Sequence, residues 1–87
     1  MADRLRLRVY SPERQLVDAE VTEVTAPGAY GEIGVLPDHA ALVTVLEPGT
    51  LSYTEGGRTS RLRIGGGFAE VRDNVMTVLA NSAEPEG

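Results

Sequence analysis

The chain of 87 residues contains no cysteine, no tryptophan and no lysine. Without cysteine it can form no disulfide framework, and a single histidine among scattered carboxylates is a poor set of zinc ligands. A domain of this length buries only about 60–65% of its unfolded surface, so its core is small. We therefore expect a domain that either packs very tightly or rests on a partner.

Basic residues are also scarce, because eight arginines stand against thirteen acids and the net charge is −5. A nucleic-acid-binding surface would be basic and clustered, so we expect no nucleic-acid partner. No window approaches the roughly 20 apolar residues of a membrane-spanning helix. The first four residues lack the apolar core of a signal peptide. We expect a soluble, cytosolic chain that can still work beside a membrane by binding a membrane protein.

Short strands are predicted along most of the chain. Leu5, Leu7 and Val9 alternate with arginines, which indicates a half-buried strand with an arginine-rich outer face. Residues 15–26 are rich in valine and threonine, and their spacing predicts either a bulge near residues 22–23 or two short strands. The apolar run at residues 40–46 predicts a fully buried strand.

Residues typical of turns separate these strands. Residues 26–28 (Ala-Pro-Gly) and the Pro37-Asp38 pair predict turns. Gly56-Gly57 and Asp73-Asn74 predict tight hairpins, since these residue types tolerate a positive φ. Three glycines at residues 65–67 predict a sharp bend or a close backbone approach.

The sum predicts an all-β fold, a flattened sandwich or barrel of about ten short strands without a long helix. Residues 1–80 would form one β-sandwich domain. Residues 81–87 are small, polar and acidic, and we interpret them as a flexible tail.

Candidate chemistry concentrates in residues 28–49, which hold four of the ten glycines and the only histidine. The glycine-rich part lacks the Gly-Lys-Ser/Thr ending of a phosphate loop. No serine lies in a nucleophile-elbow motif, so we predict no catalytic residue, cofactor or metal. His39 either braces the Pro37-Asp38 turn or contacts a partner. Glu32 is either a solvated carboxylate or a charge presented to a partner by its flanking glycines.

Five separated segments carry a resemblance to a known family. They are residues 7–14 (LRVYSPER), 32–40 (EIGVLPDHA), 46–49 (LEPG), 66–71 (GGFAEV) and 75–80 (VMTVLA). In this order they closely resemble the epsilon subunit of the F-type ATP synthase, over nearly the whole chain. The resemblance implies a flattened ten-stranded β-sandwich in a non-catalytic subunit of the central stalk.

The resemblance also implies partners and a place in the cell. The subunit would belong to the rotor of a proton-translocating ATP synthase and link the gamma subunit to the membrane c-ring during ATP synthesis. Alpha and beta subunits would be partners only within the complex. The chain would lie peripherally at the cytoplasmic face of the bacterial inner membrane, held there by its partners.

Site residues follow from the resemblance by motif position. The loop facing the c-ring would carry Tyr30, Gly31 and Glu32. The side facing gamma would carry Ser11, His39, Ala40, Leu42 and Thr44. Ala41 departs from the family, which often has proline there. The family usually continues past residues 79–81 into two helices that inhibit ATP hydrolysis, and no such role is assigned to these 87 residues.

A stand-alone β-sandwich that binds a small ligand or a protein is the alternative hypothesis. A ligand pocket of that kind would be lined with aromatic side chains. The chain has one phenylalanine, three tyrosines and no tryptophan, so it is poor in such residues.

Overall fold

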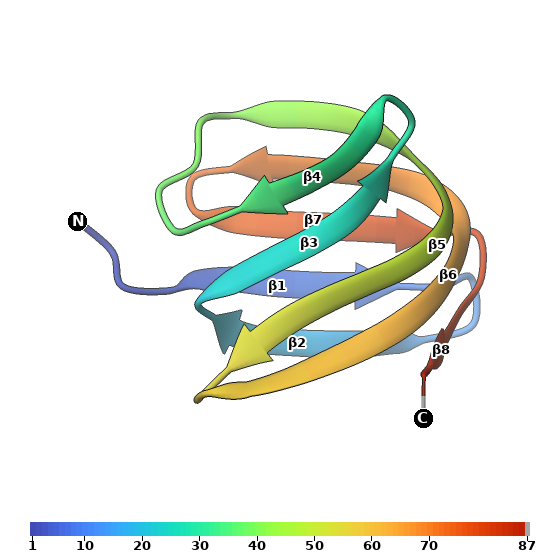
Figure 1. The fold of residues 1–87 in the computed structure, drawn as a ribbon, viewed down its shortest axis with the longest axis horizontal. Helices are drawn as coiled ribbons and strands as arrows, with labels where there is room; N and C mark the ends of the chain where they lie inside the picture. The colour runs from blue at the N-terminus through green and yellow to red at the C-terminus, as the bar shows by residue number, and fades with distance from the viewer. Residues whose placement is uncertain (87) are drawn as a thin grey trace.

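Eight strands joined by short turns form the computed structural model, which describes residues 1–86 (Figure 1). Their bounds are β1 (Leu5–Tyr10), β2 (Gln15–Val21), β3 (Glu23–Gly28), β4 (Gly31–Val35), β5 (Leu42–Glu55), β6 (Arg58–Arg72), β7 (Val75–Ala80) and β8 (Ala83–Pro85). They pair in the order β2-β1-β7-β6-β5-β3-β4, and β8 pairs with β6. The β1–β7 pair is parallel, and all the others are antiparallel. This architecture confirms the predicted all-β class.

Two long strands turn the single sheet into a sandwich (Figure 1). β5 and β6 pair along their whole length and bend together where Pro48 lies opposite Gly65. The first layer consists of β2, β1, β7 and the adjoining halves of β6 and β5. The second layer consists of β4, β3, the other halves of β5 and β6, and β8. Because each bent strand serves in both layers, the eight strands act as ten short ones.

The bend depends on glycines, as the sequence predicts. Gly66 and Gly67 have φ angles of 89° and 143°, which L side chains rarely adopt. A Cβ atom on Gly67 would overlap the carbonyl oxygen of Leu79 and lie 2.9 Å from the Cα atom of Ala80. β6 and β7 therefore approach each other more closely at Gly67 than a residue with a Cβ atom allows.

Alternating side chains from both layers build the core. Leu5, Leu7 and Val9 of β1 are at most 1% exposed, in line with the period-two pattern of the sequence. They pack with inward residues of the other strands, chiefly Val21, Val24, Val35, Leu51, Ile64, Val71, Met76 and Val78. No helix long and apolar enough to cross a membrane occurs in residues 1–86.

Residues 15–28 form two strands, which decides between the two predictions made for residues 15–26 and contradicts the turn predicted at residues 26–28. Two strands meet here, β2 and β3, with Thr22 between them, so the two-strand alternative is confirmed and the bulge is not. The turn predicted at residues 26–28 is wrong, because these residues belong to β3 and pair with β4. The chain instead turns at Ala29 and Tyr30, and the Ala29 N–H donates to the carbonyl of Val45 over 3.0 Å.

The prediction of a fully buried strand at residues 40–46 is also wrong. β5 begins at Leu42, and Val43 and Val45 are 71% and 51% exposed. The first layer covers the core with one face only, so alternate residues of this strand point outward. A run of apolar residues indicates a strand buried on both sides only where other elements cover both faces of its sheet.

The flexible tail predicted for residues 81–87 is corrected over Ala83–Pro85, which forms β8 on the edge of β6. The Gly65 N–H donates to the Ser82 carbonyl, and the Asn81 N–H donates to the Gly66 carbonyl, each over 2.9 Å. These bonds bridge the gap between the β6–β7 and β6–β8 pairings and satisfy backbone groups of β6 at the bend. Residue 87 lies outside the described residues.

Candidate functional site

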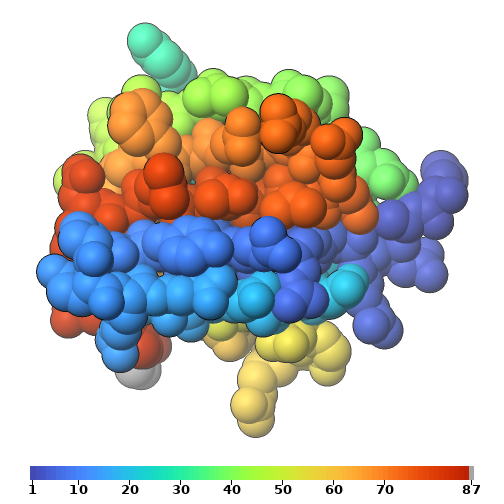
Figure 2. Space-filling model, turned by 180° about the vertical axis from the view of Figure 1, so that it is seen from behind, coloured from blue at the N-terminus to red at the C-terminus, as the bar shows by residue number. Residues whose placement is uncertain are grey.

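Exposed apolar side chains gather on the outer face of the first layer. Strand register aligns Val45, Phe68, Leu79 and Tyr10 in one row across four strands. The first three are 51%, 56% and 54% exposed, and Tyr10 is half-buried. Val43 extends the row at its β5 end. We call Tyr10, Val43, Val45, Phe68 and Leu79 the apolar band. Figure 2 shows this face, with β2 and β1 in blue at the bottom, β7 and β6 in red to orange above them, and β5 in green at the top.

Shallow hollows flank the ridge that Phe68 and Leu79 form in the apolar band. A hollow of about 260 Å³ lies on the side of Val43, and another of about 250 Å³ lies on the side of Tyr10. A continuous apolar patch with hollows is typical of a surface that binds another protein. Burying it would release about 25 cal/mol for each Å² of apolar area removed from water.

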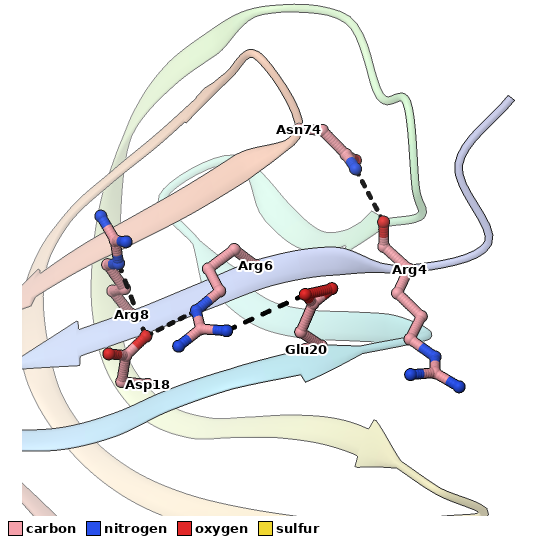
Figure 3. Close-up of polar contacts among 6 residues, drawn as sticks. All are labelled: Arg4, Arg6, Arg8, Asp18, Glu20 and Asn74. Atoms are coloured by element: carbon pink, nitrogen blue, oxygen red, sulfur yellow. Dashed lines mark hydrogen bonds and ion pairs between the residues drawn. The ribbon is translucent and has the colours of Figure 1, made fainter.

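An ion-pair ladder borders the apolar band on the β1–β2 side (Figure 3). The Nε atom of Arg6 donates to Asp18 Oδ1 over 2.7 Å, and Arg8 Nε lies 3.5 Å from the same oxygen. A third, longer contact of 3.9 Å joins Arg6 Nη1 to Glu20 Oε2. The hydrogen bond lowers the pKa of Asp18 and raises the pKa of Arg6. The arginine row therefore braces the β1–β2 pair across the strands.

Replacing Asp18 with asparagine should lower stability slightly at neutral pH and not at all in acid. Because the folded-state pKa of Asp18 is lowered, its contribution is present above the unfolded pKa of about 3.9 and is lost as pH falls through the folded value. The effect is small because the pair is exposed to solvent. Urea midpoints of D18N and the parent at about pH 7 and about pH 2 measure it.

D3N is the control for this prediction, since Asp3 forms no ion pair among residues 1–86. A D18N midpoint that stays low in acid would mean that the aspartate acts through something other than its charge.

The three residues expected to face the c-ring come together at the tip of one hairpin. Tyr30 occupies the turn between β3 and β4 and is fully exposed, at 102%. Gly31 has a φ of 125°, and Glu32 is exposed on β4 opposite Pro27. The turn protrudes from the rest of the molecule as the teal projection in Figure 2. The carboxylate of Glu32 and the ring of Tyr30 are therefore both exposed to solvent.

The residues expected to face gamma do not form one cluster. Ser11 directly follows β1, and its N–H donates to the Arg14 carbonyl over 2.9 Å. His39 and Ala40 lie in the loop before β5, at the other end of the first layer (Figure 1). Leu42 and Thr44 lie on β5 but point inward and are half-buried. The set therefore brackets the apolar band, whose exposed members alternate with Leu42 and Thr44.

The loop that carries His39 is held in place by hydrogen bonds. The His39 N–H donates to the Leu36 carbonyl over 3.2 Å and closes a turn in which Asp38 has a φ of 64°. The Asp38 N–H donates to Asn74 Oδ1 over 2.9 Å, and Asn74 Nδ2 donates to the Arg4 carbonyl over 2.7 Å (Figure 3). Asn74 thus ties this loop to the start of β1.

The His39 ring itself is turned toward its own loop. Its Nδ1 atom donates to the carbonyl of Ala40 over 2.7 Å, which supports the interpretation that it braces the turn. No group of three His, Cys, Asp or Glu side chains that could hold a metal ion occurs within residues 1–86.

Sequence reasoning missed the apolar band, although a signal was present. Phe68 is in phase with Glu70 and Arg72, whereas Ala69 and Val71 occupy the opposite, buried phase. A strand with two charged residues on one face predicts that face to be exposed, and Phe68 shares it. The phase of the charges, rather than the apolar character of single residues, identifies the outer face.

Comparison with known proteins gives the family. The model of the β-sandwich domain of the ATP synthase delta/epsilon chain matches residues 4–86. The chain belongs to this family. It is 50% identical over 84 residues to the ATP synthase epsilon chain of Carboxydothermus hydrogenoformans, covering 97% of this chain and 63% of that one. It is 46% identical over 85 residues to that of Desulfitobacterium hafniense, covering 98% and 64%.

Solved structures of ATP synthases contain the same fold. A chain in the mitochondrial ATP synthase of Euglena gracilis, solved as OSCP, F1 and c-ring, matches with a TM-score of 0.90 at 32% identity, over 98% of this chain and 55% of that one. A chain in the central stalk and c-ring of the Tetrahymena thermophila enzyme matches with a TM-score of 0.79 at 16% identity, over 91% and 64%, and shows the fold alone. The 87 residues span just under two thirds of the curated epsilon chains they match.

Proposed function

We propose that this β-sandwich is the non-catalytic body of a rotor subunit in the central stalk of a proton-translocating F-type ATP synthase. In this proposal it joins the gamma subunit to the c-ring during ATP synthesis and meets alpha and beta subunits only within the complex. The family and the Euglena assembly that contains a similar chain support this role. The chain would lie peripherally at the cytoplasmic face of the membrane, held by its partners.

The apolar band is the observation that carries the proposal. A subunit that transmits torque needs contact surfaces in two directions on one stiff body. The band supplies a non-polar surface on the first layer, and the Tyr30–Glu32 hairpin supplies a polar, protruding one. Paired strands running through both layers connect the two surfaces. We assign the band, with Ser11 and His39 at its ends, to gamma and the hairpin to the c-ring.

Co-elution with folded gamma subunit tests the assignment. At micromolar concentrations the two proteins should form a stable complex on size exclusion. Amide resonances of β1, β6 and β7 should shift on binding, while those of the β3–β4 hairpin should not. Failure to co-elute with gamma that is shown to be folded would remove the proposal.

Replacing Glu32 with lysine should weaken coupling between the rotor and the c-ring without loss of stability. Glu32 is exposed and takes part in no side-chain hydrogen bond or ion pair within residues 1–86, so its charge contributes to contacts rather than to folding. We expect ATP-driven proton pumping by the reconstituted enzyme to fall several-fold, since a reversed charge in a polar contact is repulsive. The melting temperature should stay within about 2 °C.

E55K is the matched control, because Glu55 is also exposed and ends β5 beside the start of β3, at the opposite end from the β3–β4 hairpin. Equal pumping by E32K and the parent would remove the hairpin from the c-ring contact. A large drop in the melting temperature of E32K would show that Glu32 has a structural role.

A further inference from the structure

A groove of about 750 Å³ lies at the corner where the sandwich is open, away from the apolar band and from the β3–β4 hairpin. One wall is the start of β2, residues 14–17, and the other is the first half of β6, residues 59–62. Tyr53 of β5 and residues 85–86 also line it. Nothing in the proposed rotor function uses this groove.

Two unpaired strand edges meet this groove. β2 is the last strand of its layer and pairs only with β1 among the described residues. On β6, β8 covers the edge only at residues 62–64, and the Glu86 N–H occupies the Arg61 carbonyl over 3.0 Å. Residues 58–60 of β6 therefore keep a free edge within the part of the chain described. A free strand edge offers backbone N–H and C=O groups in the spacing that an extended peptide requires.

The groove is lined by charged, neutral polar and apolar side chains. Arg14 and Arg61 line it, and within residues 1–86 neither takes part in an ion pair. Glu86 also lines the groove, and its carboxylate accepts a hydrogen bond from Thr50 Oγ1 over 2.9 Å, so two arginines stand against one carboxylate there. Val17 and Leu62 supply an apolar floor and are 6% and 5% exposed. In a chain of net charge −5, two free arginines beside an apolar floor form a local site for acidic residues.

We propose that this groove binds an extended segment of a partner protein, in which acidic residues alternate with apolar ones, as an added strand on the free edge of β2. Successive side chains of a strand point to opposite faces. The apolar residues of such a segment would pack on Val17 and Leu62, while the acids would reach Arg14 and Arg61. Backbone pairing supplies affinity, and the two arginines select an acidic sequence over a basic one.

Fluorescence anisotropy with a labelled, end-capped Glu-Val-Glu-Val-Glu-Val peptide tests this proposal on the 87-residue chain. We expect a Kd in the micromolar range and binding at least about tenfold weaker for the Lys-Val peptide of the same length. R14E/R61E should weaken binding of the Glu-Val peptide about tenfold or more, and R72E should change it less than about twofold. Arg72 is exposed and lies at the far end of β6.

Hydrogen exchange distinguishes strand addition from loose charge attraction. Among residues 15–17, the amides whose N–H groups face the free edge of β2 should become more protected when the peptide is bound, since they then gain backbone partners. The proposal is overturned by any one of three results: no saturable binding up to about 1 mM, equal binding by R14E/R61E, or protection confined to the apolar band. All three readouts are independent of gamma and the c-ring, so they can fail while the rotor proposal stands.

Discussion

Alanine at position 67 is expected to lower the free energy of unfolding by about 3–5 kcal/mol, a large part of the 5–15 kcal/mol typical of a small domain. The φ of Gly67 is 143°, which an L side chain adopts only under strain. The added Cβ would overlap the carbonyl oxygen of Leu79 and lie 3.0 Å from its carbon. That carbonyl cannot withdraw, because Gly67 pairs with Ala80 and Phe68 pairs with Leu79 in the β6–β7 ladder.

Urea unfolding of G67A measures this effect, and G34A is its matched control. Gly34 lies in β4, has no positive φ, and a Cβ there would meet no atom within 4 Å. G34A should therefore change the free energy of unfolding by less than about 1 kcal/mol, in the stabilising direction expected for alanine in a strand. If the two variants unfold at the same urea concentration, the close approach of β6 and β7 at the bend is incorrect.

Glutamate at position 68 is expected to lower the affinity for gamma by about 100-fold or more, the size of effect seen at the centre of an interface. Phe68 lies in the middle of the apolar band between Val45 and Leu79 and lines both flanking hollows. A carboxylate there would be buried without a partner once gamma covers the band, and the cost of its desolvation would oppose binding. The free chain should tolerate it, because Phe68 is 56% exposed.

Isothermal titration of F68E and the parent with gamma, together with urea unfolding of each, separates binding from folding. R58E is the control, since Arg58 is exposed on the same strand in the second layer and does not line the groove beside β2. It should retain parental affinity within about twofold. Undiminished affinity of F68E would move the gamma contact away from the apolar band.

Local chemistry made part of this fold predictable. The Gly56-Gly57 and Asp73-Asn74 hairpins have the positive φ angles that their residue types favour. The alternation of Leu5, Leu7 and Val9 predicted one buried face, and the structure buries it. These features depend on residues close in sequence, so a pattern of residue types contains the information needed.

Features that depend on distant partners were not predictable in this way. β8 pairs with residues 62–64 of β6, which lie about 20 residues earlier in the sequence, and no local pattern of residue types reports that pairing. Val43 and Val45 were predicted to be buried because apolar residues usually are. They are exposed because they lie on the outer face of the first layer, which no other described element covers. The family resemblance supplied candidate contact residues, whereas the band between them required the strand register.

The parallel pairing of β1 with β7 has a consequence for how the chain is made. Arg6 lies opposite Val75, so β1 can complete this pairing only after β7, which lies far along the sequence, has also been synthesised. The hairpins from β3 to β6 can form earlier, because their strands are neighbours in sequence. Closure of the first layer should then limit the rate, in the millisecond-to-second range of proteins dominated by distant contacts. The surface assigned to gamma, which spans β1, β5, β6 and β7, would come into being only in that last step, so assembly into a rotor would report on completed folding.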